Sequence, residues 1–331
     1  MADFAEDMPD WPAAGPRLRP VLRPVTYGIE LTPRPLSRPV FPFVHEFVAL
    51  DKPESRIIVS ADSLARWGVS ADEVFATARA NLAALVEPHD GAGDSVLRYV
   101  DDGNAYFASW LLAPGWLASF RAGYGDRRPV AFMPDTDSLI VVPDVPALLA
   151  RTYELAEEQY RGAEHRLSPQ GYTLDARDTV VPFDQAGPHE QLPAARRASR
   201  GLAAAEYAIQ THWLRETFED QYEIPEYDLE PAYVAAAQFV STTDGPCTLT
   251  VWGEDVDYLL PHTDYVAFCQ DSESGGIERL FEVPFAAVTE ITGLTPIPGM
   301  HPPRYEIRGW PAPEQLARLA QAAVTLSPEP A

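Results

Sequence analysis

Lysine is almost absent from this chain. Of its 331 residues 25 are basic, and Lys52 stands alone among 24 arginines. A phosphate-binding P-loop requires a lysine after glycine, and imine chemistry requires a desolvated lysine amine, so neither has a candidate here. Cysteine is equally scarce. The spacing of Cys247 and Cys269 is not that of metal ligands. Two cysteines also do not indicate a disulfide framework, so we expect reduced thiols.

Basic residues as a whole are outnumbered. The chain carries 49 acidic residues against those 25 bases, for a formal net charge of -24. A surface of that charge repels the phosphate backbone of nucleic acids and anionic lipid headgroups. We therefore expect no nucleic-acid partner and no membrane partner, and any protein partner should be basic.

Long apolar runs are also missing. The uncharged stretch at residues 105–120 has 16 residues and is interrupted by Pro114-Gly115, whereas a membrane span needs about 20 apolar residues. The acidic start of the chain does not have the pattern of a signal peptide. With 46% hydrophobic residues the chain can still form a substantial core, and we expect a cytoplasmic protein.

The length favours two domains, and residues 1–187 indicate the first of them. Residues 1–18 are expected to form a flexible acidic tail. Residues 19–187 alternate strand-like and helical patterns, which predicts an α/β domain with a mixed sheet. Within it, Ser70 and Glu73 form a capping box before a helix, and residues 129–134 and 138–142 predict a strand pair.

Four Arg-Pro dipeptides fall within residues 16–42. They fit either a polyproline ligand segment or an extended edge strand, because proline restricts the residue before it to extended conformations. We favour the edge strand, since Leu18, Val21, Leu22 and Val25 are spaced so that they can pack.

The second half of the chain begins with a predicted connecting helix, residues 188–220. Leu202, Ala205, Ile209 and Trp213 share one face of it and are expected to be buried. Residues 221–331 alternate short strands with turn signals and end in an amphipathic helix. This order predicts a smaller, mainly antiparallel, acidic α+β domain.

One candidate pocket combines polar residues of the first domain. Asp135 and Asp137 flank a predicted turn, where two carboxylates could bind a divalent cation or act as an acid/base pair. Aspartates also favour turns through local hydrogen bonds, and we prefer that interpretation. Asn81, Tyr106 and Ser109 could join Asp137 in a pocket, although a hydrogen-bonded structural asparagine is the simpler expectation.

Recognised catalytic patterns do not occur. The chain contains no G-x-S-x-G elbow, no dinucleotide-binding fingerprint and no H-E-x-x-H. Its seven histidines show no helical metal spacing, and the two cysteines lie in predicted strands. We predict no catalytic residue, no metal ligand and no cofactor.

A second candidate site is acidic. Residues 216–290 contain seventeen acids and one base, Arg279, and residues 216–230 alone contain seven acids interleaved with aromatic residues. Such a run is ordinarily a solvated face, but it could also dock a basic protein. The residues expected on this partner face are Glu219, Asp220, Tyr222, Glu223, Glu226 and Tyr227.

Residues 19–183 resemble the YtpQ family, a group of uncharacterised bacterial proteins. The resemblance rests on RPVLRPV (19–25), on RIIVSADSLARWGVSADEVFATARANLAAL (56–85), on Tyr106-Phe107-Ala108-Ser109 and on Pro134-Asp135-Thr136-Asp137-Ser138-Leu139. It implies a cytoplasmic bacterial α/β domain and assigns no catalytic residues. Residues 188–331 resemble no family.

These observations predict a non-enzymatic binding or adaptor protein whose acidic C-terminal half docks a basic partner protein. The alternative is a hydrolase or cation-dependent enzyme that uses Asp135 and Asp137. A homo-oligomer stays open, because the aromatic stretch at residues 105–120 could serve as a contact patch, although we expect it in the core.

Overall fold

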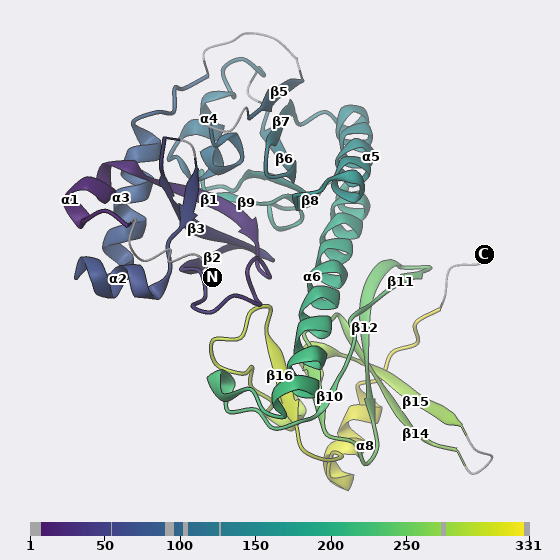
Figure 1. Cartoon of the computed structure of the whole chain (residues 1–331). Helices are drawn as coiled ribbons and strands as arrows, with labels where there is room; N and C mark the ends of the chain where they lie inside the picture. The colour runs from purple at the N-terminus through teal and green to yellow at the C-terminus, as the bar shows by residue number, and fades with distance from the viewer. Residues whose placement is uncertain are drawn as a thin grey trace. The chain divides into compact units, whose positions relative to one another are not determined.

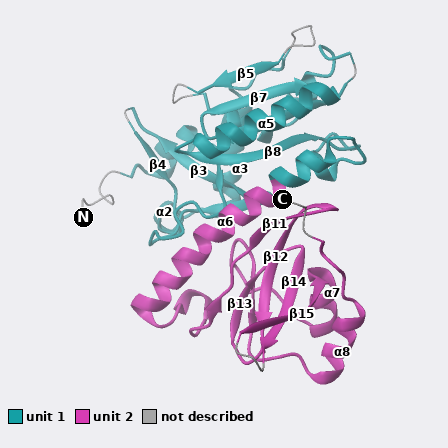
Figure 2. Cartoon of the chain, turned by 90° about the vertical axis from the view of Figure 1, so that its right-hand side faces the viewer, with its two compact units in different colours: residues 1–198 teal, residues 199–331 magenta. Residues whose placement is uncertain are grey.

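The computed structural model describes residues 8–53, 55–89, 96–101, 105–125, 127–272 and 276–327. Helices and several antiparallel and mixed sheets together give a mixed α+β fold. The chain divides into two compact units, residues 1–198 and 199–331, shown in separate colours in Figure 2. The division falls inside the long helix α6 (Leu192–Gln221), within the predicted connecting helix.

The first unit contains a four-stranded sheet near the N-terminus. Its strands are β1 (Leu18–Pro24), β2 (Ser37–Phe41), β3 (Val44–Asp51) and β4 (Arg56–Ile58). The order is β1-β3-β2, with β4 also paired to β3. The Arg-Pro segment thus supplies the edge strand β1, as predicted, and Leu18, Val21 and Leu22 are buried there. Prolines are tolerated at an edge because one side of the strand needs no ladder hydrogen bonds.

A second sheet of this unit has five strands in the order β5-β7-β6-β8-β9. Their bounds are β5 (Leu97–Val100), β6 (Pro129–Asp135), β7 (Ser138–Pro143), β8 (Arg166–Leu174) and β9 (Val180–Pro182). The pairing of β6 with β7 confirms the predicted strand pair.

The expectation of a mixed sheet in the first unit was wrong. Every strand pairing among its described residues is antiparallel, whereas parallel pairs occur in the second unit, between β10 and β13 and between β12 and β14. An alternating strand–helix pattern suggested parallel crossovers. The helices instead follow hairpins and flank antiparallel strands, a difference that local periodicity does not encode.

Helices cover the sheets of the first unit (Figure 1). Their bounds are α2 (Ala61–Trp67), α3 (Ala71–Ala83), α4 (Trp116–Ser119) and α5 (Pro146–Gly162), with 3-10 turns η2 (Phe107–Leu112) and η3 (Phe183–Gln185). The Ser70 hydroxyl accepts the backbone N–H of Glu73 at 3.2 Å, so the predicted cap does begin α3. Helix α3 packs on β1, and α5 packs on β6 and β8.

Residues 8–18 are not a tail. They form helix α1 (Trp11–Ala14), the 3-10 turn η1 (Gly15–Arg17) and the start of β1. The rings of Trp11 and Trp67 lie 5.5 Å apart, and the Trp67 indole N–H donates to the Pro9 carbonyl. Residues 1–7 lie outside the described residues. Acidity suggested mobility, but burial of a tryptophan ring stabilises an ordered start.

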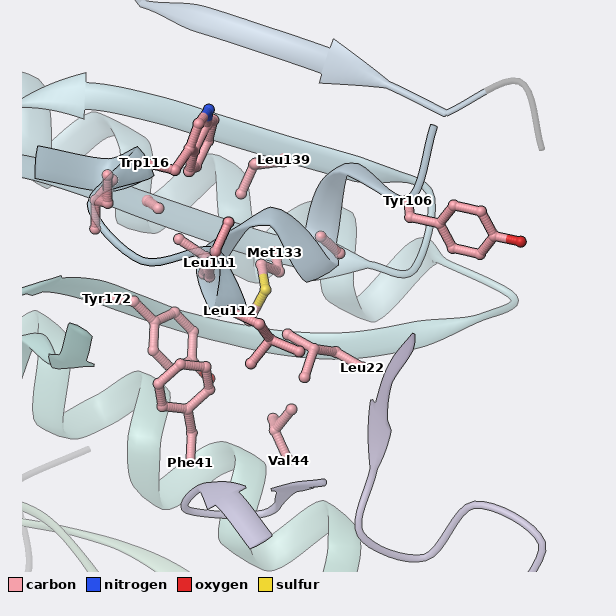
Figure 3. Packing of buried hydrophobic residues seen from close by; sticks show 14 of the residues in the cluster. Leu22, Phe41, Val44, Tyr106, Leu111, Leu112, Trp116, Met133, Leu139 and Tyr172 are labelled. Atoms are coloured by element: carbon pink, nitrogen blue, oxygen red, sulfur yellow. The ribbon is translucent and has the colours of Figure 1, made fainter. Parts of the chain in front are cut away.

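A large apolar cluster fills the space between the two sheets. Figure 3 shows Leu22 of the first sheet beside Leu112, and Met133 of the second sheet beside Leu111, with Val44 of the first sheet beyond Leu22. Leu111 and Leu112 belong to the stretch at 105–120, most of which is buried. The prediction that this stretch belongs to the core is therefore confirmed.

The second unit has two sheets, in the orders β11-β12-β14-β15 and β10-β13-β16. Their strands are β10 (Tyr233–Val234), β11 (Gln238–Thr242), β12 (Gly245–Gly253), β13 (Tyr258–Pro261), β14 (Tyr265–Asp271), β15 (Ile277–Pro284) and β16 (Arg304–Ile307). Its other elements are the 3-10 turn η4 (Pro225–Tyr227) and helices α7 (Phe285–Thr292) and α8 (Pro313–Gln321).

Helix α6 buries only part of the predicted face, on which Leu202 has no exposed surface. Ile209 is 48% exposed, whereas Glu206 and Gln210 are buried beside Tyr207. The reason is Arg304 of β16, which is fully buried and donates to the Gln210 side-chain oxygen at 2.7 Å. Polar residues can face a core when a buried partner satisfies them.

Candidate functional site

Hydrogen bonds to its own aspartate side chains stabilise the turn between β6 and β7. Asp135 accepts the backbone N–H of Asp137 at 2.9 Å on one oxygen and the Ser138 hydroxyl at 2.8 Å on the other. The Thr136 hydroxyl donates to Asp137, whose side chain is exposed. These local bonds explain both aspartates without a ligand. Among the described residues no three acidic, histidine or cysteine side chains gather in a geometry that could hold a metal ion.

Asn81 and Ser109 support the backbone of the first sheet. The Asn81 amide donates to the carbonyls of Gly15 at 2.8 Å and Leu18 at 3.0 Å, which ties helix α3 to the start of β1. The Ser109 hydroxyl accepts the N–H of Leu22 at 3.2 Å. The asparagine therefore has the structural role that the sequence favoured, and neither side chain shares a hydrogen bond with Asp135 or Asp137.

Tyr106 lies at the edge of the core and points away from it (Figure 3). Its backbone is left-handed, with φ of 58°, and the Asp101 carboxylate accepts its N–H at 2.6 Å. The tyrosine hydroxyl donates to Asp51, and the Arg56 guanidinium lies 4.2 Å from the ring centroid. Burial, followed by the bond to Asp51, raises the pKa of Tyr106. A bulky residue in this conformation is rare and marks a position held by its surroundings.

Asp51, Arg19, Arg23 and Arg56 were not singled out from the sequence. Asp51 lies 3.7 Å from the Arg19 guanidinium and 3.5 Å from that of Arg56. Asp137 and Tyr106 both interact electrostatically with the Arg23 guanidinium. Two of the five residues predicted to form a pocket therefore share an electrostatic partner. The strand pairing that gathers these side chains is long-range, and the only local signal was the repeated Arg-Pro dipeptide.

A groove of about 290 Å³ also opens in the first unit. Phe41, Leu112 and Leu117 are among the apolar residues that line it, but polar atoms make up about half of its surface. Its two charged groups are already paired, Arg79 with Glu46 and Asp178 with Arg121. The groove therefore offers no unpaired charge that would orient a polar ligand.

The second unit carries the predicted partner face at the end of α6. We define the acidic segment as residues 216–230. All seven of its acidic side chains are exposed: Glu216, Glu219, Asp220, Glu223, Glu226, Asp228 and Glu230. Tyr222 is 76% exposed, whereas Tyr227 is half-buried against an apolar cluster. Of the six predicted residues, which are close together in the sequence, all but Tyr227 are therefore exposed.

The acidic segment has a defined backbone. Ile224 and Leu229 are buried and exchange backbone hydrogen bonds of 2.9 and 3.3 Å, which closes the loop after α6. Tyr222 ends the helix with φ of 62°, and its N–H donates to the Phe218 carbonyl at 3.1 Å. The left-handed position after a helix usually holds glycine or asparagine, so a tyrosine there is unfavourable for the backbone.

Few cations neutralise the acidic segment. Elsewhere in this unit Arg308 pairs with Asp257 and with Glu306. Within the described part of the chain, Glu219, Asp220 and Glu223 have no cationic group at ion-pair distance, although His212 lies 3.3 Å from Glu216. Glu219, Asp220 and Glu223 therefore present uncompensated negative charge beside the exposed ring of Tyr222.

Comparison with protein-family models, curated proteins and solved structures found no match. Among the described residues, none of the helices has both the length and the apolar character needed to cross a bilayer.

Proposed function

We propose that this protein is a non-enzymatic binding or adaptor protein and that its acidic segment docks a basic partner protein. In this proposal residues 199–331 act as the acidic docking domain. Residues 19–183 form a YtpQ-like domain of a cytoplasmic bacterial protein. The proposal rests above all on Tyr222, an exposed aromatic side chain at an unfavourable backbone position inside a field of carboxylates.

Aromatic and charged groups have complementary roles in such an interface. Tyrosine is enriched among the residues that carry binding energy, because it buries a large rigid surface and keeps a hydroxyl for hydrogen bonding. The surrounding carboxylates would attract lysine and arginine side chains of the partner and accelerate encounter. Because the loop is closed by buried Ile224 and Leu229, little order has to be gained on binding.

The cation-dependent alternative receives less support from the geometry. Both oxygens of Asp135 are engaged in closing their own turn, so a cation would have to displace these hydrogen bonds. We therefore place the binding protein first.

The test begins with a native pull-down from the lysate of the encoding organism, identified by mass spectrometry. Retention is compared at about 0.1 M and about 1 M sodium chloride, where the Debye length falls from about 10 Å to about 3 Å. A basic protein retained only at low salt is then purified for affinity measurements.

Two variants with the same change in net charge then show whether binding depends on the acidic segment itself or only on the net charge of the protein. The first neutralises Glu219, Asp220, Glu223 and Glu226 as Glu→Gln and Asp→Asn. The control neutralises four exposed acids of the first unit as Glu→Gln: Glu154, Glu158, Glu164 and Glu190.

At about 0.5 kcal/mol for each partly exposed charge, the first variant should bind about thirtyfold more weakly. The control should bind like the parent, and Tyr222→Ser should weaken binding at both salt concentrations. No basic protein at low salt, or equal affinity of the two charge variants, would refute the proposal.

A further inference from the structure

Strand pairing gathers three arginines on one face of the first sheet. Arg19 and Arg23 are four residues apart on β1 and therefore point to the same side. Arg19 pairs with Ala49 of β3, and Arg56 of β4 pairs with Asp51, two residues further along β3. Cross-strand partners lie on the same side of a sheet, so Arg19, Arg23, Asp51 and Arg56 share one face. We call these four side chains the arginine face.

The arginine face has more positive than negative charge. The Asp51 carboxylate lies within ion-pair distance of two guanidinium groups, at 3.7 Å from that of Arg19 and 3.5 Å from that of Arg56. It also accepts a hydrogen bond from the Tyr106 hydroxyl. No second carboxylate lies within ion-pair distance of either arginine among the described residues. In a chain with a net charge of -24 this local excess of cations runs against the average composition.

Arg23 is the least compensated member. Its guanidinium donates to the Leu22 carbonyl at 2.8 Å and lies 5.8 Å from the centroid of the Tyr27 ring. Within the described residues it forms no ion pair. Asp137 acts on it only from beyond ion-pair distance. Burial lowers the pKa of Arg23. A partly desolvated guanidinium without a carboxylate is unfavourable until an anion binds it.

Two tyrosines flank the arginines. Tyr27 is partly exposed and packs edge-on against Phe47 at 5.3 Å, on the same sheet face as Arg23. Tyr106 is held in its left-handed conformation with its ring against Arg56. A guanidinium fork recognises the paired oxygens of a phosphate or carboxylate, and aromatic rings suit the organic part of the molecule that carries it.

We propose that the arginine face binds the phosphate or carboxylate group of a small organic molecule. Arg23 is the main contact and Arg56 the second, while Asp51 and Tyr106 hold Arg56 in place. This site belongs to the first unit and the acidic segment to the second, so the two proposals can fail independently.

The test uses inorganic phosphate and acetate as separate probes of the full-length protein. Each is titrated by isothermal calorimetry against sodium chloride of equal ionic strength. In parallel, arginines are labelled with phenylglyoxal, with and without each probe, and the labelled positions are located by mass spectrometry. The variants are Arg23→Gln and Arg56→Gln, and the matched control is Arg98→Gln, an exposed arginine of β5.

We expect saturable binding of at least one probe and its protection of Arg23 and Arg56, but not of Arg98, against phenylglyoxal. Arg23→Gln should weaken binding at least about tenfold, because a hydrogen bond to a charged group contributes about 1.5–3 kcal/mol. Protection by phosphate alone assigns a phosphate ligand, and protection by acetate alone a carboxylate. No heat of binding together with no selective protection would overturn the proposal, and the labelling of the parent protein decides this even if a variant fails to fold.

Discussion

Replacing Glu46 with glutamine should destabilise the first unit strongly. Glu46 lies in the middle of β3 with no exposed surface. Its carboxylate accepts three hydrogen bonds, one from Arg38 at 2.7 Å and two from Arg79 at 2.9 and 2.7 Å. A glutamine has one amide oxygen, which in the better orientation would accept from Arg38 and from one N–H of Arg79, while its N–H₂ would face the Nε–H of Arg79. The change therefore removes a charge and opposes donors to donors.

The magnitude follows from the contacts. A hydrogen bond to a charged group contributes about 1.5–3 kcal/mol. At least one of the three bonds would be lost, and those that remain would no longer be made to a carboxylate. Because the side chains of Arg38 and Arg79 are 34% and 40% exposed, water can replace part of what they lose. The expected cost is therefore about 3 kcal/mol, the lower end of the cost of removing one partner of a buried ion pair.

Native-state hydrogen exchange measures this loss locally. For peptides covering β3 (Val44–Asp51), a loss of about 3 kcal/mol should accelerate exchange roughly a hundredfold if the strand opens with the unit. The double variant Glu46→Gln/Arg79→Gln should lose less than the sum of the single variants, since they share one interaction. The control Arg98→Gln should leave exchange unchanged. Acceleration below about fivefold, equivalent to about 1 kcal/mol, would refute the reasoning.

Three further predictions concern buried polar groups. Arg304→Met should destabilise the second unit by about 3–5 kcal/mol, because Gln210 and the other acceptors of the buried guanidinium lose their donor. Urea unfolding measures this loss. Asn81→Ala should lower the free energy of unfolding by about 1–3 kcal/mol, while Arg98→Gln should not, again by urea unfolding. Burial raises the pKa of several tyrosines, so these side chains stay protonated in the folded state, while tyrosines of the unfolded chain ionise near pH 10. The free energy of unfolding should therefore fall as the pH rises above about 10. Urea midpoints measured at rising pH will check this. These tyrosines are Tyr124, Tyr153, Tyr172 and Tyr207.

Local elements of the fold were predictable because their causes are local. Helix α3 begins after Ser70, whose hydroxyl accepts the N–H of Glu73, as the capping box predicted. The turn at Asp135 formed through hydrogen bonds within four residues. The acidic segment was recognisable for the same reason, since its charges are consecutive in the chain and all of its carboxylates are exposed.

Other features depended on distant partners. The spacing of apolar residues on α6 predicted that Ile209 is buried, but it is exposed. Gln210 is buried instead, because Arg304, 94 residues later in the chain, donates a hydrogen bond to it. The antiparallel character of the first unit's sheets likewise depends on which strands meet, and a strand's own pattern does not specify its neighbour.

By itself, the sequence determined the charge of the protein, its capped helices, its tight turns and the exposed acidic segment. Each of these follows from composition or from interactions between residues a few positions apart. Only the tertiary structure decided that Arg19, Arg23 and Arg56 lie on one sheet face around Asp51, because strand pairing brings them together. It likewise decided that Asn81 supports β1 and that Glu46 lies buried between two arginines, since each of these needs partners from separate elements.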